Sequence, residues 1–433
     1  MKYYSTNKQA PVASLQEAVV KGLAADKGLF MPMSIKPLPQ DFYDTIDSLS
    51  FQEIAYRVAD AFFGEDIPAY TLKQIVYDTL SFDVPLVKVA DNIYSLELFH
   101  GPTLAFKDVG GRFMARLLGY FIKKEGQKNV NVLVATSGDT GSAVANGFLG
   151  VEGIHVYVLY PKGKVSEIQE KQFTTLGQNI TALEVDGTFD DCQALVKSAF
   201  MDKELNEHLS LTSANSINVA RFLPQAFYYF YAYAQLKRAG KADNAVICVP
   251  SGNFGNITAG LFGKKMGLPV KRFIAANNRN DIFYQYLQTG KYNPRPSIAT
   301  IANAMDVGDP SNFARVLDLY GGSHADISAE ISGTTYTDEQ IRETVKETWK
   351  EHHYLLDPHG ACGYRALVEG LKEGETGVFL ETAHPAKFLE TVESIIGEAV
   401  EIPAKLQEFM KGEKKSFQMT KEFADFKKYL LTL

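Results

Sequence analysis

The sequence lacks the features that mark secreted, membrane and metal-binding proteins. Its 433 residues include three cysteines, Cys192, Cys248 and Cys362, which lie too far apart to suggest a disulfide framework or a paired-cysteine zinc site. There is no run of about 18 apolar residues, and residues 1–10 are polar, without the apolar segment of a secretory signal. We therefore expect no metal, no membrane partner and a reducing, cytoplasmic location.

Long blocks of one charge sign are also missing. Lys and Arg (44) against Asp and Glu (51) give a net charge of −7, so no nucleic-acid partner is expected. Hydrophobic residues make up 45% of the chain and charged residues 22%, which is ordinary for a globular protein. Because single cores stop growing at roughly 250 to 300 residues, the length predicts more than one domain.

The first 90 or so residues are predicted to form a helical section. Apolar residues recur at helical spacing over 15–23, 51–63 and 72–80, between proline-containing connectors. From Asn92 onward the character changes, and short apolar runs alternate with helical patterns. That alternation predicts an α/β fold with parallel sheets.

Individual elements of the α/β part follow from the same patterns. The runs typical of buried parallel strands are 130–135, 155–160, 180–185, 245–249, 272–276 and 377–380. The helices predicted between them are 165–176, 189–200, 218–238 and 257–266. Residues 282–335 follow no period and are interpreted as a loop-rich insertion. Residues 338–352 and the last thirty residues are predicted to be helical.

One loop at the end of a predicted strand is rich in small polar residues. In open parallel sheets, ligands bind at the carboxyl ends of strands, where loops lead into helices. After the strand 130–135 come Thr136, Ser137, Gly138, Asp139, Thr140, Gly141 and Ser142. Their amides and hydroxyls could surround a carboxylate or phosphate. The run is equally compatible with a turn and a helix N-cap, and the pattern leaves both open.

A second loop follows the strand predicted at 245–249. It contains Gly252, Asn253, Phe254, Gly255 and Asn256, and its two glycines let the main chain approach an anion closely. It lacks both the third glycine of a dinucleotide-binding loop and the Gly-Lys-Ser/Thr of a P-loop. The loop is therefore a candidate phosphate site without being a nucleotide motif.

A single lysine, Lys107, stands among apolar and aromatic residues in the run 100–108 (HGPTLAFKD), ahead of a helix expected to open near Gly110. Burial lowers the pKa of a lysine and supplies the neutral amine that a Schiff-base nucleophile needs. The alternative is a surface lysine whose stem lies on an apolar wall.

Taken in this order, the three segments resemble the fold type II pyridoxal-phosphate (PLP) enzymes, and closely resemble the threonine synthase family. HGPTLAFKD (100–108) is similar to the family's PLP-lysine segment, TSGDTG (136–141) to its cofactor-ring loop and GNFGN (252–256) to its PLP-phosphate loop. Residues 4–6 with 22–30 resemble its N-terminal segment.

The resemblance continues at the C-terminal end, where TAHPAKF (382–388) is similar to the family's last conserved motif. There are two departures. Ser251 stands where many relatives have glycine, and DPHGA (357–361) differs from the usual Asp-Pro-His-Thr run. The resemblance thus covers nearly the whole chain.

The resemblance implies a role for each part of a PLP site. Lys107 would hold the cofactor as a Schiff base and move protons at the substrate's Cα and Cβ. Residues 252–256 would bind the cofactor phosphate at a helix N-terminus. Asp139 would face the 3′-oxygen of the cofactor, unless it is a helix N-cap, and Thr382 would meet the ring nitrogen.

The substrate's own phosphate needs a separate site. SANSINVAR (213–221) resembles the family's segment for it, in which Asn215, Ser216 and Arg221 offer hydrogen-bond donors. The alternative for Arg221 is a surface arginine at the start of a helix.

The remaining polar residues near the site receive smaller roles. Thr136, Ser137 and Thr140 are expected to meet the substrate's carboxylate or phosphate. His100, His359 and His384 are expected to make structural hydrogen bonds and are not assigned to catalysis.

The implied reaction converts O-phospho-L-homoserine and water to L-threonine and phosphate by β,γ-replacement. Its rivals are a dehydratase or phospho-lyase of the same fold, and a non-catalytic ligand-binding relative. Arg221 with Asn215 and Ser216 argues against a dehydratase, which has no second phosphate to bind. Retention of Lys107 argues against loss of catalysis. The oligomeric state is left open.

The expected architecture is a PLP-dependent fold type II, with parallel-sheet core domains flanked by helices. Residues 1–95 would form the N-terminal helical section, 96–118 with 225–433 the large PLP-binding domain, and 119–224 the smaller α/β domain.

Overall fold

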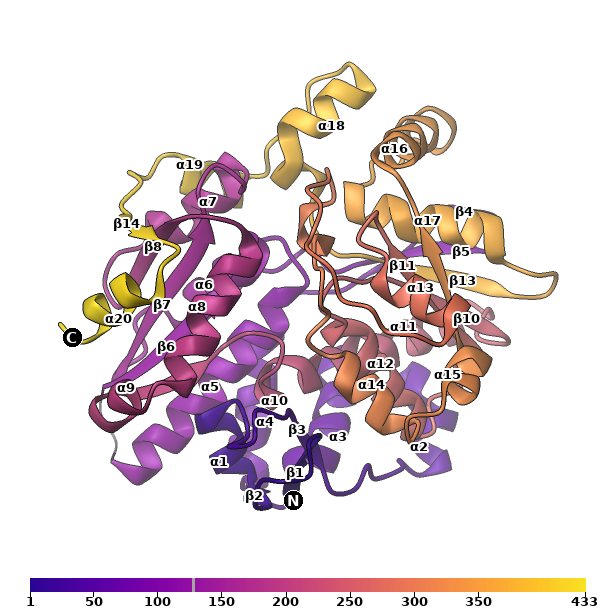
Figure 1. Cartoon of the computed structure of the whole chain (residues 1–433). Helices are drawn as coiled ribbons and strands as arrows, with labels where there is room; N and C mark the ends of the chain where they lie inside the picture. Colours follow the sequence, from indigo (N-terminus) through magenta and orange to yellow (C-terminus); the bar gives the residue numbers. More distant parts are fainter. Residues whose placement is uncertain (127–128) are drawn as a thin grey trace.

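Two separate parallel sheets organise the chain. The computed structural model describes residues 1–126 and 129–433. In Figure 1 the five-stranded sheet lies on the left and the six-stranded sheet on the right, with the N-terminal section below them. No helix in the described part of the chain is long and apolar enough to cross a membrane. Mixed α/β architecture with parallel sheets is therefore confirmed.

The six-stranded sheet has the order β12-β11-β10-β13-β5-β4. Its strands are β12 (Ile331–Thr335), β11 (Arg272–Asn277), β10 (Ala245–Pro250), β13 (Thr376–Glu381), β5 (Ile93–Glu97) and β4 (Leu86–Ala90). All neighbours are parallel except β4 and β5, which form an antiparallel edge pair. The strands β10, β11 and β13 are almost entirely buried, as expected for a sheet covered on both faces by helices.

The five-stranded sheet has the order β14-β8-β7-β6-β9 and is parallel throughout. Its strands are β14 (Phe417–Thr420), β8 (Ile180–Asp186), β7 (Ile154–Pro161), β6 (Val130–Ala135) and β9 (Ser210–Ser213). Helices α6 (Asp139–Phe148), α7 (Glu167–Thr174) and α8 (Phe189–Met201) connect consecutive strands and pack on the sheet.

The N-terminal section combines a small sheet with helices. Strands β1 (Lys2–Ser5), β2 (Ala13–Ser14) and β3 (Phe30–Pro32) form a three-stranded antiparallel sheet that the sequence patterns missed. Its helices are α1 (Leu15–Lys21), α2 (Gln40–Thr45), α3 (Phe51–Phe63) and α4 (Ala69–Thr79). Helix α3 begins at a capping box formed by Ser50 and Glu53, and it buries one face at helical spacing.

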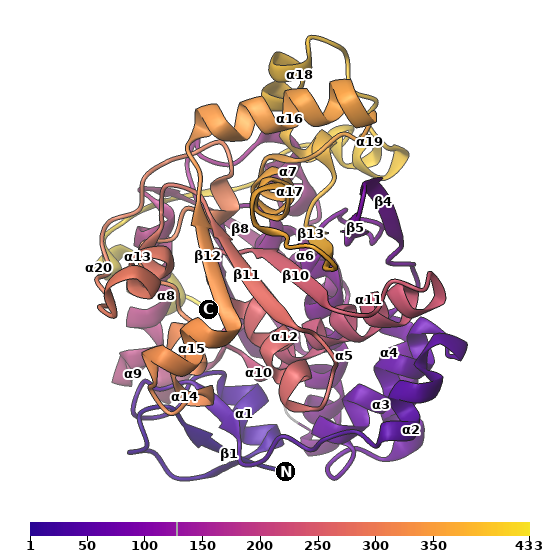
Figure 2. The same cartoon turned by 90° about the vertical axis from the view of Figure 1, so that its right-hand side faces the viewer.

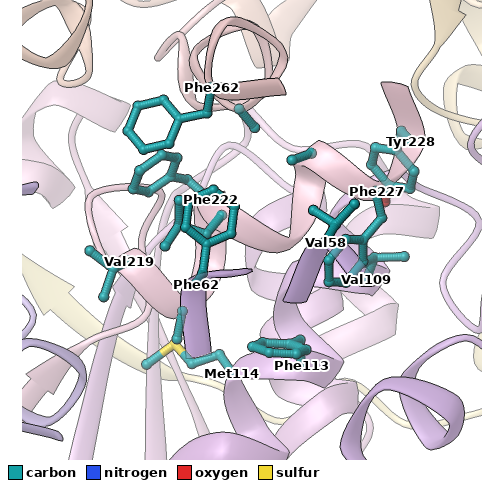
Figure 3. Packing of buried hydrophobic residues seen from close by; sticks show 14 of the residues in the cluster. Val58, Phe62, Val109, Phe113, Met114, Val219, Phe222, Phe227, Tyr228 and Phe262 are labelled. Carbon is teal, nitrogen blue, oxygen red and sulfur yellow. The ribbon is translucent and has the colours of Figure 1, made fainter. Parts of the chain in front are cut away.

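Aromatic residues from distant segments build the core between the sheets (Figure 3). Phe62 of α3 lies 6.1 Å from Phe262 of α12 (Gly255–Lys265), and Phe262 lies 5.3 Å from Phe222 of α10 (Val219–Phe222), centroid to centroid. Phe113 of α5 (Lys107–Glu125) packs edge-on against Phe227 of α11 (Ala226–Arg238). The helical N-terminal section is thus packed onto the helix that begins at Lys107.

Most strands of the α/β part lie within two residues of their predicted bounds. The prediction of a single helix over 218–238 was wrong. The segment consists of α10, a 3-10 turn η2 (Leu223–Gln225) and α11. Pro224 lies at the break, where its ring and missing N–H interrupt a continuous helix. Helix α5 also begins three residues earlier than expected, at Lys107 rather than near Gly110.

The interpretation of residues 282–335 as a loop-rich insertion was only partly right, since residues 290–302 and 306–312 form no helix or strand. The segment contains α13 (Ile282–Thr289), η3 (Asn303–Met305), α14 (Phe313–Leu319), α15 (His324–Glu330) and β12. These helices are only seven or eight residues long, which is too short for a periodic pattern to stand out. Beyond them, α16 (Asp338–His352) begins and ends as predicted, and α17 (Pro358–Gly370) packs on β10, β11 and β13.

The C-terminal segment differs from its predicted place. It holds η4 (Pro385–Phe388), α18 (Leu389–Ile396), α19 (Ala404–Met410), β14 and α20 (Phe423–Leu430). Strand β14 pairs with β8, and α20 packs against α8. Strand β14 and helix α20 therefore belong with the five-stranded sheet and not, as residues 225–433 were expected to, with the larger one. Helix α18 stays with the larger part, because it packs against α16, beside which it lies at the top of Figure 2. At the other boundary, β4 and β5 join the six-stranded sheet, so the predicted limit at 95/96 cuts a strand.

Because α20 packs on the five-stranded sheet, we expect substitutions of two phenylalanines to differ greatly in their effect on the free energy of unfolding. Phe426 is fully buried against residues such as Leu183 and Leu195, whereas Phe417 is 60% exposed. Phe426→Ala is expected to lower the free energy of unfolding by about 3 to 5 kcal/mol, because it leaves a cavity. The matched change Phe417→Ala should stay within about 0.5 kcal/mol. Urea unfolding followed by circular dichroism checks both, and equal effects would contradict this placement of α20.

Candidate active site

Segments from both sheets meet at one cavity at the carboxyl ends of the strands. The predicted site residues that line it are Lys107, Thr140, Asn215, Ser216, Arg221, Gly252, Asn253, Phe254, Gly255, Asn256 and Thr382. Thr136, Ser137 and Asp139 are not part of its lining. A larger cavity of about 540 Å³ shares Asn215 with it and extends along the N-terminal section.

Lys107 is the first residue of α5, and two hydrogen bonds hold the backbone of the residue before it. The preceding N–H, of Phe106, donates to the Thr382 carbonyl at 2.8 Å, and Tyr228 Oη donates to the Phe106 carbonyl. Leu104 adopts a left-handed conformation (φ 59°), so the chain turns sharply before the helix. Lys107 is thereby brought into the cavity beside Thr382, a residue at the far end of β13.

The electrostatic surroundings favour a neutral Lys107 amine. Burial lowers its pKa to about 8, and the positive charges of Arg221 and Lys387 act in the same direction, whereas Asp139 opposes them. Within residues 1–126 and 129–433, no carboxylate forms an ion pair with Lys107 Nζ. Lys107 is partly buried, and its lowered pKa is consistent with the predicted desolvation of its amine.

The loop after β10 forms a cradle of backbone amides at the start of α12. Phe254 has a left-handed conformation (φ 67°), and a Cβ on Gly252 would lie 2.7 Å from the Ala304 carbonyl oxygen, so glycine is required there. Asn256 Nδ2 is buried and has no hydrogen-bond partner among the described residues. Such a helix N-terminus with an unused donor suits a phosphate.

Ser251, which stands where many relatives have glycine, does not disturb this cradle. Its hydroxyl donates back to the Val249 carbonyl at 2.8 Å, so the side chain is occupied within its own strand end.

Asp139 is not a helix N-cap, which settles one of the alternatives left open. Gly138 holds the N-cap position of α6, and the Asp139 carboxylate instead forms an ion pair with Lys387 at 2.5 Å. Gln169 Nε2 also donates to it, at 3.0 Å. Burial alone would raise the pKa of Asp139, but the charges of Lys387 and Lys107 hold it below its ordinary value.

Thr136 has a different place from the one predicted. Its hydroxyl oxygen accepts hydrogen bonds from the Gly138 and Gly141 amides, at 2.9 and 2.7 Å, and the residue is fully buried. It therefore shapes the loop, and the expected substrate contact of Thr136 stays a prediction. Thr140 lies in the cavity wall, whereas Ser137 lies outside the lining and is partly exposed.

Arg221 is a buried cation that forms no ion pair with the residues that the structure describes. It is 1% exposed, and its Nη1 donates to the Ala214 carbonyl, whereas its Nε has no partner among those residues. Burial lowers its pKa to about 10. The surface-arginine alternative is therefore wrong. Gly110 makes room for this arrangement, since a Cβ there would lie 2.5 Å from the Arg221 carbonyl oxygen.

Asn215 and Ser216 differ in whether their side-chain hydrogen-bonding groups are available to a ligand. The Asn215 amide pairs with the Ala135 backbone, accepting at 3.1 Å and donating at 2.7 Å, so it largely extends the sheet beside β6. Ser216 Oγ accepts from Asn312 Nδ2 at 3.2 Å and keeps its own proton available to a ligand.

Sequence patterns missed a second buried arginine. Arg315 is fully buried and donates to neutral oxygens only, including Asn312 Oδ1 at 2.7 Å, the Phe30 carbonyl and the Ile217 carbonyl. It lies over the Phe222 ring, and burial lowers its pKa to about 9. Residues 282–335 were interpreted as a loop-rich insertion, so nothing marked this arginine as important.

The sequence patterns also missed Glu381, which directly precedes Thr382. Glu381 is fully buried, and neither carboxyl oxygen has a hydrogen-bond partner among the described residues. Burial, and then the charge of Asp357, raise the pKa of Glu381 well above its ordinary value. A Cβ on Gly360 would lie 2.4 Å from Glu381 Oε2. The glycine in DPHGA therefore provides the space that this carboxyl group fills.

The histidines make structural contacts. His359 Nδ1 bonds to Asp357 at 2.5 Å, while its Nε2 accepts from the Ala304 amide at 3.1 Å. His384 Nδ1 accepts from the Ala386 amide at 3.0 Å, and His100 Nε2 lies 2.9 Å from Glu97. No group of three or more His, Cys, Asp or Glu side chains suited to a metal occurs among the residues that the structure describes.

Comparisons with known proteins agree along the whole chain. Residues 84–382 match the family described as pyridoxal-phosphate dependent enzyme, residues 2–80 the threonine synthase N terminus, and residues 360–430 the threonine synthase C-terminal family. A curated threonine synthase from Serratia marcescens is 45% identical over 433 residues, covering 100% of both chains.

Solved structures give the same result. The crystal structure of threonine synthase from Escherichia coli matches with a TM-score of 0.94 at 44% identity, covering 100% of both chains. The structure of PLP-bound threonine synthase from Brucella melitensis matches with a TM-score of 0.91 at 36% identity, covering 99% of this chain and 98% of that one.

The buried Glu381 predicts a pH effect on stability. Because its folded pKa is raised, this group favours the folded state fully below the ordinary value of 4.5, and the advantage is lost as pH rises toward the folded value. One extra proton on the folded chain corresponds to about 1.4 kcal/mol lost per pH unit within that window. Glu381→Gln should therefore make the free energy of unfolding fall less steeply between about pH 6 and pH 8.

Urea unfolding at several pH values measures this slope. Glu413→Gln, at an exposed carboxylate, is the matched control and should leave the wild-type slope unchanged. Identical slopes for wild type and Glu381→Gln would show that Glu381 is already ionised in the folded protein.

Proposed function

The chain belongs to the threonine synthase family of pyridoxal-phosphate-dependent enzymes, and we propose that it converts O-phospho-L-homoserine and water to L-threonine and phosphate with Lys107 as its cofactor lysine. The observation that carries the proposal is the pairing of two features in one cavity. A lysine of lowered pKa and a buried arginine without an anion both line it.

The residues present fit pyridoxal phosphate. Lys107 supplies an amine whose lowered pKa makes its neutral form more accessible near neutral pH, and the amides at the start of α12, with the unused Asn256 Nδ2, supply donors for the cofactor phosphate. Thr382, which follows β13, offers a hydroxyl to the ring nitrogen. When bound, the cofactor withdraws electrons from the substrate carbons next to the amine, so that their protons become acidic.

Lys107 then acts as the group that moves protons. It begins a helix whose preceding N–H and carbonyl are both hydrogen-bonded, so the side chain extends from a fixed point. As a neutral amine it takes a proton from the substrate Cα, gives that proton up, and then takes one from Cβ. After the phosphate leaves, it delivers a proton to Cγ and, once the hydroxyl of water has added at Cβ, a proton to Cα. A lowered pKa favours both tasks, because the amine can accept and release a proton near neutral pH.

The substrate phosphate is bound by Arg221 and Ser216. Arg221 carries an uncompensated charge and a free Nε, and a buried charge without a partner is unfavourable until an anion arrives. Ser216 adds a hydroxyl, held in place by Asn312. Arg315 adds a second buried positive charge behind Asn312. Thr140, at the start of α6, is placed to meet the substrate carboxylate.

The rival reactions make different demands on this cavity. A dehydratase acting on serine or threonine has no substrate phosphate, so a buried Arg221 beside the cofactor would serve no purpose in it. A phospho-lyase acting on a related phosphorylated amine would use Arg221 in the same way, and only the products distinguish it. A ligand-binding relative without catalysis would not need an amine of lowered pKa.

The first test concerns Lys107. Purified wild-type protein supplied with pyridoxal phosphate and O-phosphohomoserine should release phosphate and threonine in equal amounts. Lys107→Ala should form neither at a measurable rate, because the group that moves the protons is gone. Lys346→Ala, an exposed lysine on α16, serves as the control and should behave as wild type. Phosphate without threonine would identify a phospho-lyase instead.

The second test concerns Arg221. Arg221→Met should lower kcat/KM for O-phosphohomoserine by about 10²- to 10³-fold, since truncating one partner of a buried charge pair costs roughly 2 to 5 kcal/mol. Arg221→Lys, which keeps the charge without the planar fork, should lose less. In the absence of ligands Arg221→Met should unfold no more easily than wild type, because it removes an unpaired buried charge. Unchanged kcat/KM in Arg221→Met would contradict a role for Arg221 in binding the substrate phosphate.

A further inference from the structure

Two lysines, the fully buried Lys387 and the partly buried Lys107, share the surroundings of one carboxylate. Lys387 and Asp139 are 0% and 3% exposed, and their charged groups are 2.5 Å apart. The same Asp139 is the only carboxylate whose charge raises the pKa of Lys107. Of the two lysines, Lys387 holds the ion pair, and Lys107 has none within the described part of the chain.

The pair is held rigidly by three separate segments. Lys387 Nζ also donates to the Thr103 carbonyl at 2.8 Å, four residues before Lys107. Ser166, at the N-cap of α7, donates to the Lys387 carbonyl at 2.8 Å, and Gln169 of the same helix donates to Asp139. Neither partner can turn toward Lys107 without breaking these bonds.

The other charged groups around Lys107 do not compete for it. Asp108 accepts from the Thr103 amide at 3.0 Å and from its hydroxyl at 2.5 Å, so its charge is used on the far side of the turn. Arg221 is positive and opposes protonation of Lys107. Tyr228 is occupied with the Phe106 carbonyl. Asp139 is therefore the charged group that favours a proton on Lys107, against the burial that lowers its pKa.

We propose that Lys387 is a positioning residue that takes up the charge of Asp139 and so leaves Lys107 as a neutral amine. The proposal rests on the proposed function, in which Lys107 is the cofactor lysine. Without Lys387, the buried Asp139 would have Lys107 as its nearest cation and would hold it as an ammonium ion, which is not a nucleophile.

The test measures the proton affinity of Lys107 without turnover. Cofactor-free protein is mixed with pyridoxal phosphate over a range of pH, and the rate at which the visible absorbance of bound cofactor appears is recorded. Because only the neutral amine reacts, the midpoint of this pH profile follows the pKa of Lys107. The variants are Lys387→Met, Lys387→Arg, Asp139→Asn and the double variant Lys387→Met/Asp139→Asn, with Lys346→Met at an exposed site as control.

Each variant has a defined expectation. Lys387→Met should move the midpoint upward by about one to two pH units, the size of shift that a nearby unpaired charge produces. Asp139→Asn should move it downward, Lys387→Arg should keep it near that of wild type, and the double variant should return it to wild type or slightly below. A purely structural role for Lys387 would not be rescued by removing its partner.

Two results would overturn the proposal: an unchanged midpoint in Lys387→Met, or a double variant as strongly shifted as the single one. If Lys387→Met does not fold, as judged by circular dichroism, the downward shift in Asp139→Asn decides instead, and an unchanged midpoint there also overturns it. Threonine formation by wild type is measured separately. Failure of the proposed function would leave wild type inactive, whereas failure of this inference would leave it active with unmoved midpoints.

Discussion

Partial burial of Lys107 at the cavity, which lowers the pKa of its amine, sets the requirements for the groups around it. Such a lysine can lose its proton near neutral pH only if no carboxylate holds it. The charge of Asp139 acts on Lys107, but Asp139 forms its ion pair with Lys387. The turn at Leu104 and the bonds to Phe106 fix the start of α5. Reactivity here therefore depends on packing as much as on the lysine itself.

Two buried positive charges have no carboxylate partner among the described residues. Arg221 lines the cavity, whereas Arg315 lies outside its lining, next to Asn312. A buried charge without a partner weakens the empty protein and favours the binding of an anion. In the proposed function that anion is the substrate phosphate. Burial raises the pKa of Glu381 well above its ordinary value, which favours its protonated form beside Asp357.

Local patterns were reliable where an element is long or entirely buried. Strand β6 and helices α3 and α16 begin and end as predicted, because apolar spacing and capping residues are local properties. They failed for the short helices between 282 and 335 and for β14, whose pairing with β8 depends on a strand far away in the chain. The loops after β6 and β10 were found as ligand loops, since small residues and glycines mark such turns directly.

By itself, the sequence determined the family, the cofactor, the parallel α/β architecture and the placing of Lys107 and the 252–256 loop, because each is recorded in a contiguous run of residues. Only the tertiary structure decided which polar and charged groups pair with one another. Thr136 shapes its loop, Asp139 pairs with Lys387, and Glu381 occupies the space left by Gly360. The physical reason is that a proton's position depends on distances and burial between groups remote in sequence, which no local pattern contains.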